Sequence, residues 1–210
     1  MNISNPEQAF NALLLAWPKF VSECRLVLGS EHHYQAVLYH CLRLTGVPAC
    51  QLGMNVKQYI PDPKTQLGRS ESERRQEGYK GFEPTPDATI FHPGIMGDWR
   101  RRRRKETLMD SLLSIEMKVS EREGARLRPK EVINDIKKLS ALRQEIRHRY
   151  SEVPAANTIG LMIVVDTAPD QKERMTPESL QRCREVSREW DIRFGYLDGC
   201  RDINPANPLS

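Results

Sequence analysis

The stretch that decides the fold is Leu112-Leu113-Ser114-Ile115-Glu116-Met117-Lys118-Val119. From Leu113 to Val119 an apolar residue recurs at every second position, which is the period of a β-strand and places these residues on one face of a sheet. The other face carries Glu116 and Lys118, whose side chains leave the sheet roughly 7 Å apart because a strand rises about 3.3 Å per residue. A carboxylate beside an ammonium on a mostly apolar strand suits a site that holds a divalent cation and a water molecule.

A second short strand is predicted upstream, at Pro86-Asp87-Ala88-Thr89-Ile90-Phe91. Proline is tolerated at the first position of a strand, and the β-branched and aromatic residues that follow favour extended structure. If the two strands pair, the carboxylates of Asp87 and Glu116 point at one place. Two converging carboxylates suit a hard cation such as Mg²⁺, with phosphate and water oxygens completing its coordination.

Pro86-Asp87, followed by Glu116-Met117-Lys118, resembles the motif of the PD-(D/E)XK superfamily, the restriction-endonuclease-like nucleases. The resemblance implies a metal-dependent nuclease in which Asp87, Glu116 and Lys118 are catalytic. It also implies that Mg²⁺ or Mn²⁺ binds to the two carboxylates and to the backbone carbonyl of Met117. Lys118 is then expected to orient the attacking water or help to deprotonate it.

A fourth candidate metal ligand is Glu31, at the start of a helix predicted from Glu31 to about Leu44 with Ser30 as its N-cap. Its place on the helix directs it along the edge that faces the core. In the superfamily an acidic residue of the first core helix often reaches the metal, which makes Glu31 the candidate. The alternative is that a glutamate in a first helical turn is favoured simply by the helix dipole.

The order of the predicted elements also fits the superfamily. The core elements are a helix at 31–44, strands at 54–60, 86–91 and 112–119, a helix at 130–150 and a strand at 158–166. This αβββαβ order implies a mixed central sheet flanked by helices. The 210 residues are expected to form a single domain, made of a core at about 30–167, a helical region at 5–28 interrupted or kinked at Pro18, a helix–strand pair at 176–198 and a loose tail at 199–210.

Two connections between the strands are expected to be irregular. Residues 62–84 read as a long surface connection with a short helix around 70–76, and residues 92–110 carry a run of basic residues. Arginine binds phosphate through forked donors, so the run predicts nucleic-acid binding above the proposed site. The alternatives are a solvated loop or a basic patch like a localisation signal. The predicted nucleic-acid-binding residues are Arg100, Arg101, Arg102, Arg103, Arg104, Lys105, Arg126 and Lys138.

Lys138 is chosen because Asp135-Ile136-Lys137-Lys138-Leu139 resembles a pattern of stand-alone members of the superfamily, in which a basic side chain contacts substrate phosphate. Lys137 is the rival for this role, and an ordinary exposed helix face is the alternative to both. Charge is unevenly placed as well: residues 100–150 hold 16 Lys and Arg against 8 Asp and Glu, whereas the whole chain has a net charge of only +4. This asymmetry favours one surface that faces a polyanion.

Composition narrows the class of protein. A hydrophobic fraction of 39% with 29% charged residues is typical of a soluble globular domain, and no apolar run approaches the roughly 20 residues that span a bilayer. Five cysteines without a Cys-x-x-Cys pair favour reduced thiols over structural zinc or disulfides. We therefore expect a cytoplasmic protein that does not bind membranes.

The leading hypothesis is a Mg²⁺- or Mn²⁺-dependent endonuclease whose partner is nucleic acid, with DNA favoured, and for which a homodimer is one open arrangement. The second hypothesis is a catalytically silent module that keeps the fold and binds nucleic acid. The third is a purely structural α/β domain in which Glu116 and Lys118 form an ordinary ion pair.

Overall fold

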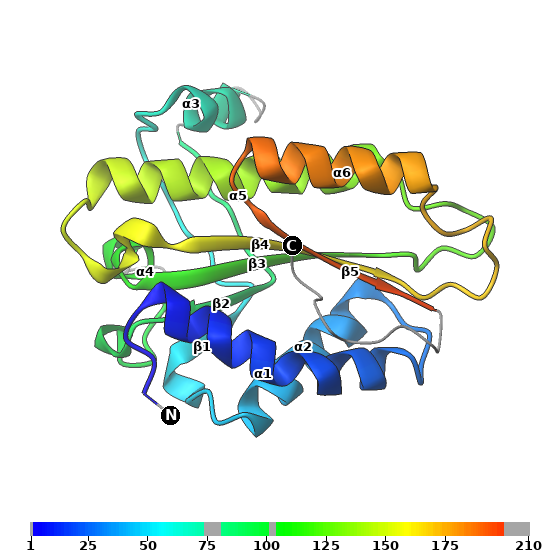
Figure 1. Cartoon of the computed structure of the whole chain (residues 1–210). Coiled ribbons are helices and arrows are strands. Elements are labelled where there is room, and N and C mark those ends of the chain that lie inside the picture. Colours follow the sequence, from blue (N-terminus) through cyan, green and yellow to red (C-terminus); the bar gives the residue numbers. More distant parts are fainter. Residues whose placement is uncertain (1, 74–80, 101–103, 200–210) are drawn as a thin grey trace.

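The fold is built on one five-stranded sheet, seen in Figure 1. The computed structural model describes residues 2–73, 81–100 and 104–199. In spatial order the strands are β1 (Leu52–Met54), β2 (Ala88–Phe91), β3 (Ser111–Val119), β4 (Ile159–Asp166) and β5 (Arg193–Asp198). The first three pair antiparallel and the last three pair parallel, so the sheet is mixed, as the element order predicts.

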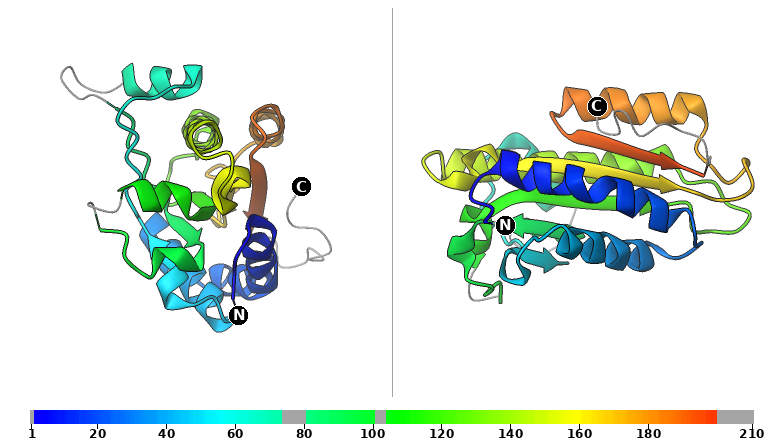
Figure 2. Two further views of the ribbon diagram at one scale, coloured as in Figure 1. Left: turned by 90° about the vertical axis from the view of Figure 1, so that its left-hand side faces the viewer. Right: turned by 60° about the horizontal axis from the view of Figure 1, so that its bottom comes forward.

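Helices cover both faces of this sheet, which Figure 2 shows from its end. One face carries α1 (Pro6–Cys24) and α2 (Glu31–Leu44), and the other carries α5 (Pro129–Arg149) and α6 (Pro177–Glu189). The shorter helices α3 (Gln66–Glu73) and α4 (Arg104–Met109) lie in the connections on either side of β2, and 3₁₀ turns in the described residues occupy Ala49–Gln51, Pro93–Ile95 and Pro154–Asn157. No helix within the described residues is long and apolar enough to cross a membrane.

The alternation of residue types along β3 predicts one apolar face and one face with charged residues, and the structure has both. Leu113, Ile115, Met117 and Val119 all belong to the core formed with α1 and α2. The opposite face carries Glu116 and faces α5. The parallel neighbour β4 is buried along its whole length, as expected for a central strand with helices on both sides.

Most predicted elements are confirmed within about a residue at each end. The helix predicted at 31–44 is α2, and the helix predicted at 130–150 is α5. The C-terminal pair is α6 and β5, with Thr176 capping the helix at the Ser179 amide. These elements have strong periodicity and local cap signals, which explains why sequence alone locates them.

The first strand is the clearest error of the sequence prediction. Residues 54–60 were predicted to be extended, but β1 ends at Met54 because Asn55 adopts a positive φ of 51° and turns the chain. Asparagine is one of the few residues that tolerate this conformation. Further on, Ile60 forms only an isolated bridge with Phe82.

Three other predictions also need correction. Helix α1 continues through Pro18 and ends at Cys24, before the predicted end at residue 28. Trp17, directly before the proline, and Phe20, two residues after it, pack into the core. The short helix predicted at 70–76 is α3 and begins earlier, at Gln66, while residues 74–76 lie outside the described part. The 92–110 connection contains α4, which was not predicted.

Candidate active site

The register of β2 and β3 brings the two predicted catalytic carboxylates together. Ala88 pairs with Ile115 in the antiparallel ladder, so Asp87, the residue before it, lies beside Glu116. Both side chains are buried, with Asp87 6% and Glu116 8% exposed. Burial raises the pKa of Glu116, and the nearby charge of Asp87 raises it further. The sequence-based expectation that these acids meet therefore agrees with the geometry.

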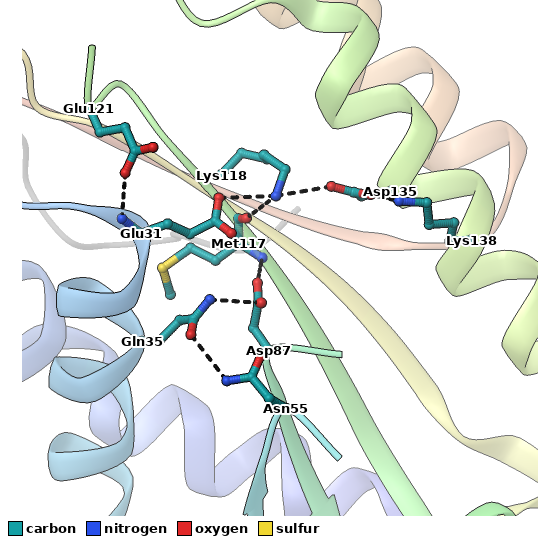
Figure 3. A network of polar contacts seen from close by, with 9 residues as sticks. All are labelled: Glu31, Gln35, Asn55, Asp87, Met117, Lys118, Glu121, Asp135 and Lys138. Carbon is teal, nitrogen blue, oxygen red and sulfur yellow. Dashed lines mark hydrogen bonds and ion pairs between the residues drawn. The ribbon is translucent and has the colours of Figure 1, made fainter. Parts of the chain in front are cut away.

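Both oxygens of Asp87 are held in place, as Figure 3 shows. The Gln35 amide donates to Oδ1 at 2.8 Å, and the backbone N–H of Met117 donates to Oδ2 at 2.6 Å. Asn55 in turn donates to the Gln35 carbonyl oxygen at 3.4 Å. Burial, then the nearby charge of Glu31, raises the pKa of Asp87 from 3.8 to about 6, while the Met117 hydrogen bond lowers it in part.

Glu116 is in the opposite situation, because no described residue donates a hydrogen bond to its carboxylate or forms an ion pair with it within 4 Å. Burial raises its pKa well above the ordinary value, and the charges of Asp87 and Asp135 raise it further. Lys118 and Lys138 only partly offset this increase. Ionised Glu116 is thus a largely buried charge that two lysines offset only in part, and a cation or a proton would stabilise it.

Lys118 is surrounded by acceptors from three different elements (Figure 3). Its ammonium lies 3.0 Å from Glu31, 3.1 Å from Asp135 and 2.9 Å from the backbone carbonyl of Met117. Burial alone would lower the pKa of Lys118, but the charges of Asp135 and Glu31 reverse this and raise the pKa above its ordinary value. Lys118 is therefore a cation at neutral pH.

Two of the predicted metal ligands contact Lys118 in this structure. Glu31 and the Met117 carbonyl oxygen, both expected to bind an ion, instead accept hydrogen bonds from the Lys118 ammonium. The backbone N–H of Glu31 is itself bonded to the Glu121 carboxylate at 2.8 Å. As the side chains stand, the described residues contain no group of three or more His, Cys, Asp or Glu that could hold a metal ion.

An open cleft of about 620 Å³ between the sheet, α5 and the segment before β2 gives access to Glu116 and Lys118, whereas Asp87 and Glu31 do not line it. Its floor includes Glu116 and Lys118, and α5 contributes Asp135 and Lys138. The whole lining is Glu71, Phe82, Glu83, Pro84, Thr85, Glu116, Lys118, Asn134, Asp135 and Lys138. The cleft is therefore wide enough to admit a ligand to the buried carboxylate.

The connection that carries the basic run leaves and rejoins the sheet at the end away from this cleft, and the predicted overhang of the run falls partly on residues outside the described part. It connects the end of β2 to the start of β3, where Phe91 pairs with Ser111, whereas Asp87 and Glu116 lie at the other end of this ladder. From Ser111 to Glu116 the strand spans roughly 17 Å. In Figure 1, α4 accordingly lies at one end of β3 and the β3–α5 connection at the other.

The predicted phosphate-binding residues are thus divided between two places. Arg100 is held by Asp98, Arg104 begins α4, and Lys105 is exposed; Arg101, Arg102 and Arg103 lie outside the described residues. Arg126 lies in the connection between β3 and α5, and Lys138 lies within α5. Arg126 donates to the Lys172 backbone carbonyl at 2.9 Å, and Lys138 lines the cleft.

Sequence reasoning missed the roles of three polar residues. Gln35 and Asn55 orient Asp87, and Asp135 contacts the ammonium groups of both cleft lysines. The signal available in the sequence was the position of Gln35 and Asp135 beside the apolar residues of their helices, and the structure shows both residues to be buried. The chain matches no protein-family model, no curated protein and no solved structure. Function is therefore inferred from the geometry of the cleft.

Proposed function

We propose that the chain is a metal-dependent nuclease with a restriction-endonuclease-like αβββαβ core, acting on nucleic acid, with DNA the favoured substrate. The single observation that carries the proposal is the state of Glu116. Its carboxylate is buried beside Asp87, borders an open cleft and has no hydrogen-bond donor among the described residues. Such a group has a strong tendency to take up a cation or a proton.

The donor set fits Mg²⁺ or Mn²⁺, because both ions prefer carboxylate, carbonyl and water oxygens. Asp87 and Glu116 would hold the ion, with the Met117 carbonyl and Glu31 available if Lys118 shifts. Bound there, the ion would lower the pKa of a water molecule and neutralise charge on the scissile phosphate. Burial raises the pKa of both carboxyls, the charge of Glu31 adds to this for Asp87, and the charge of Asp87 adds to it for Glu116. A bound cation would stabilise the ionised form of both groups.

The neighbouring residues position these groups. Gln35 and the Met117 N–H fix the two oxygens of Asp87 by hydrogen bonds of 2.8 and 2.6 Å. Lys118 keeps its proton because Asp135 and Glu31 stabilise the ammonium. This supports an electrostatic role, in which Lys118 orients water and stabilises the negative charge that develops on the phosphate, over deprotonation of the water.

Lys138 supplies the second cation of the cleft. Its side chain is 44% exposed, and its ammonium is held by Asp135 at 2.6 Å. A partly exposed lysine that lines the cleft beside Glu116 is placed to bind the phosphate of a strand entering the cleft. The basic residues around α4 lie roughly 17 Å along β3 from Glu116, so we assign them to phosphates distant from the scissile one.

A cleavage assay tests the proposal. Supercoiled plasmid, single-stranded DNA and RNA are incubated with the protein in Mg²⁺, Mn²⁺ or EDTA. We expect cleavage that needs the metal and is lost in Glu116→Gln, which keeps the shape of the side chain but removes its charge. Glu189→Gln is the matched control, because Glu189 is exposed on α6 and does not line the cleft.

The other outcomes separate the remaining hypotheses. Tight binding of nucleic acid without cleavage of any substrate would identify a catalytically silent binding module. Absence of both binding and cleavage would leave a structural domain. Equal activity of wild type and Glu116→Gln would contradict the proposed site even if cleavage occurs.

A further inference from the structure

Asp135 is a buried acid of the cleft that the proposed reaction does not yet use. It lies in the first half of α5 and is 5% exposed. One carboxylate oxygen, Oδ2, lies 3.1 Å from the Lys118 ammonium, and the other, Oδ1, lies 2.6 Å from the Lys138 ammonium. A single carboxylate therefore joins a lysine of the sheet to a lysine of the helix, as Figure 3 shows.

We propose that Asp135 is a positioning residue that holds Lys118 and Lys138 side by side, so that the two ammonium groups face one phosphate group of the substrate next to Glu116. This inference rests on the proposed nuclease function and adds to it how the cationic half of the site is built. Asp135 itself touches neither the metal nor the substrate.

The geometry around Lys118 explains why Asp135 is needed. An ammonium has three protons to donate. Here the acceptors are Glu31 on α2, the Met117 carbonyl on β3 and Asp135 on α5, one from each layer of the fold. These three directions fix the position of the nitrogen on a long flexible side chain. Removing Asp135 leaves two acceptors, both on the far side of Lys118 from α5, and the ammonium is expected to move away from the cleft.

The same carboxylate restricts Lys138. Lys138 follows Asp135 by three residues, so the two side chains are neighbours on the surface of α5. The aspartate draws the lysine ammonium toward the sheet, although 44% of the lysine side chain remains exposed. Lys138 can then reach a ligand in the cleft without losing its anchor.

A purely structural ion pair is the competing explanation, and it makes a different prediction. A buried pair contributes little net stability, because desolvation offsets the attraction between the charges. If Asp135 only stabilises the fold, its replacement changes the folding free energy and affects activity equally in every background. If it acts through Lys118, its effect on activity disappears when Lys118 is absent.

A double-mutant cycle tests this difference. We expect Asp135→Asn to lower kcat roughly 10- to 100-fold with a smaller change in KM, the range typical of residues that orient a functional group. In a Lys118→Met background the same substitution should cause no further loss, because coupled residues are not additive. An equal loss in both backgrounds would overturn the proposal. Asp170→Asn is the matched control, since Asp170 is exposed and lies outside the cleft.

A second measurement does not depend on cleavage. In proton–nitrogen NMR spectra of the lysine ammonium groups, Lys118 should give a signal protected from exchange, assigned by its loss in Lys118→Met. Asp135→Asn should broaden or shift this signal, and Asp170→Asn should not. An unchanged signal would refute the positioning role. A changed signal in a protein that cleaves no nucleic acid would refute the nuclease function while retaining the Asp135–Lys118 contact.

Discussion

Replacing Asp87 by asparagine should remove part of the pH dependence of the folding free energy. The size of this effect follows from the raised pKa of Asp87. Burial and nearby negative charge raise the pKa of Asp87 from 3.8 to about 6 in the folded protein. One pKa unit corresponds to about 1.4 kcal/mol, so ionising this carboxyl costs the folded state roughly 3 kcal/mol. The cost is absent below about pH 4 and complete above about pH 7.

The sign follows from the direction of the pKa change. A carboxyl with a raised pKa binds its proton more tightly in the folded state, so its contribution to stability is present at low pH and is lost as pH rises through about 6. Asp87→Asn is uncharged at every pH and has no such loss. Neutralising Asp87 also lowers the pKa of Glu116, which adds a change of the same sign.

Urea unfolding in EDTA, followed by circular dichroism from pH 4 to pH 8, measures the effect. Asparagine keeps only one acceptor for the donors of Gln35 and Met117, so a constant offset between the proteins is expected. Relative to that offset, wild type should lose roughly 3 kcal/mol against Asp87→Asn across this range. A difference that does not change with pH, or that changes in the opposite direction, would refute the electrostatic description of the site.

Four further predictions concern the site and the basic residues near α4. Glu116→Gln should unfold at a higher temperature than wild type at pH 8 in EDTA, because it removes a buried charge without a partner, and a lower unfolding temperature would contradict this. The variant should also lose any stabilisation by Mg²⁺. Mg²⁺ at 100 times its Kd should stabilise the wild-type protein by about 2.7 kcal/mol. In calorimetry this stabilisation should be larger at pH 8 than at pH 5, because protons compete with the ion for the carboxylates. A stabilisation that does not depend on pH would count against carboxylate ligands. Gln35→Leu leaves one Asp87 oxygen without a donor and should destabilise the protein by about 1–3 kcal/mol in urea unfolding. Asn55→Ala should have a smaller effect, because the hydrogen bond from Asn55 to Gln35 is long at 3.4 Å. A larger effect of Asn55→Ala than of Gln35→Leu would rule out this chain of contacts. Lys105→Ser should reduce the steepness of log K for nucleic-acid binding against log salt concentration by about 1, with kcat unchanged. An unchanged slope would exclude a contact between Lys105 and a phosphate.

The local pattern of the chain was sufficient for most of the elements. Alternation of apolar residues located β3 and assigned Glu116 and Lys118 to one face, and an N-cap signal located α2 from Glu31 to Leu44. These features depend on period and on neighbouring residues, which are properties of the sequence itself. Asn55 was missed because its turn depends on the backbone conformation of one residue and not on a repeated pattern.

Pairing between distant segments decided the rest. The antiparallel register of β2 and β3 puts Asp87 beside Glu116 and makes the intervening connection leave and rejoin the sheet at the opposite end of the ladder. Likewise, Asp135 reaches Lys118 only because α5 packs across that face of the sheet. A sequence specifies which residues can carry charge and which face each one shares, since these follow from local geometry. Which charges become neighbours is set by how strands and helices pack, because that depends on the whole chain at once.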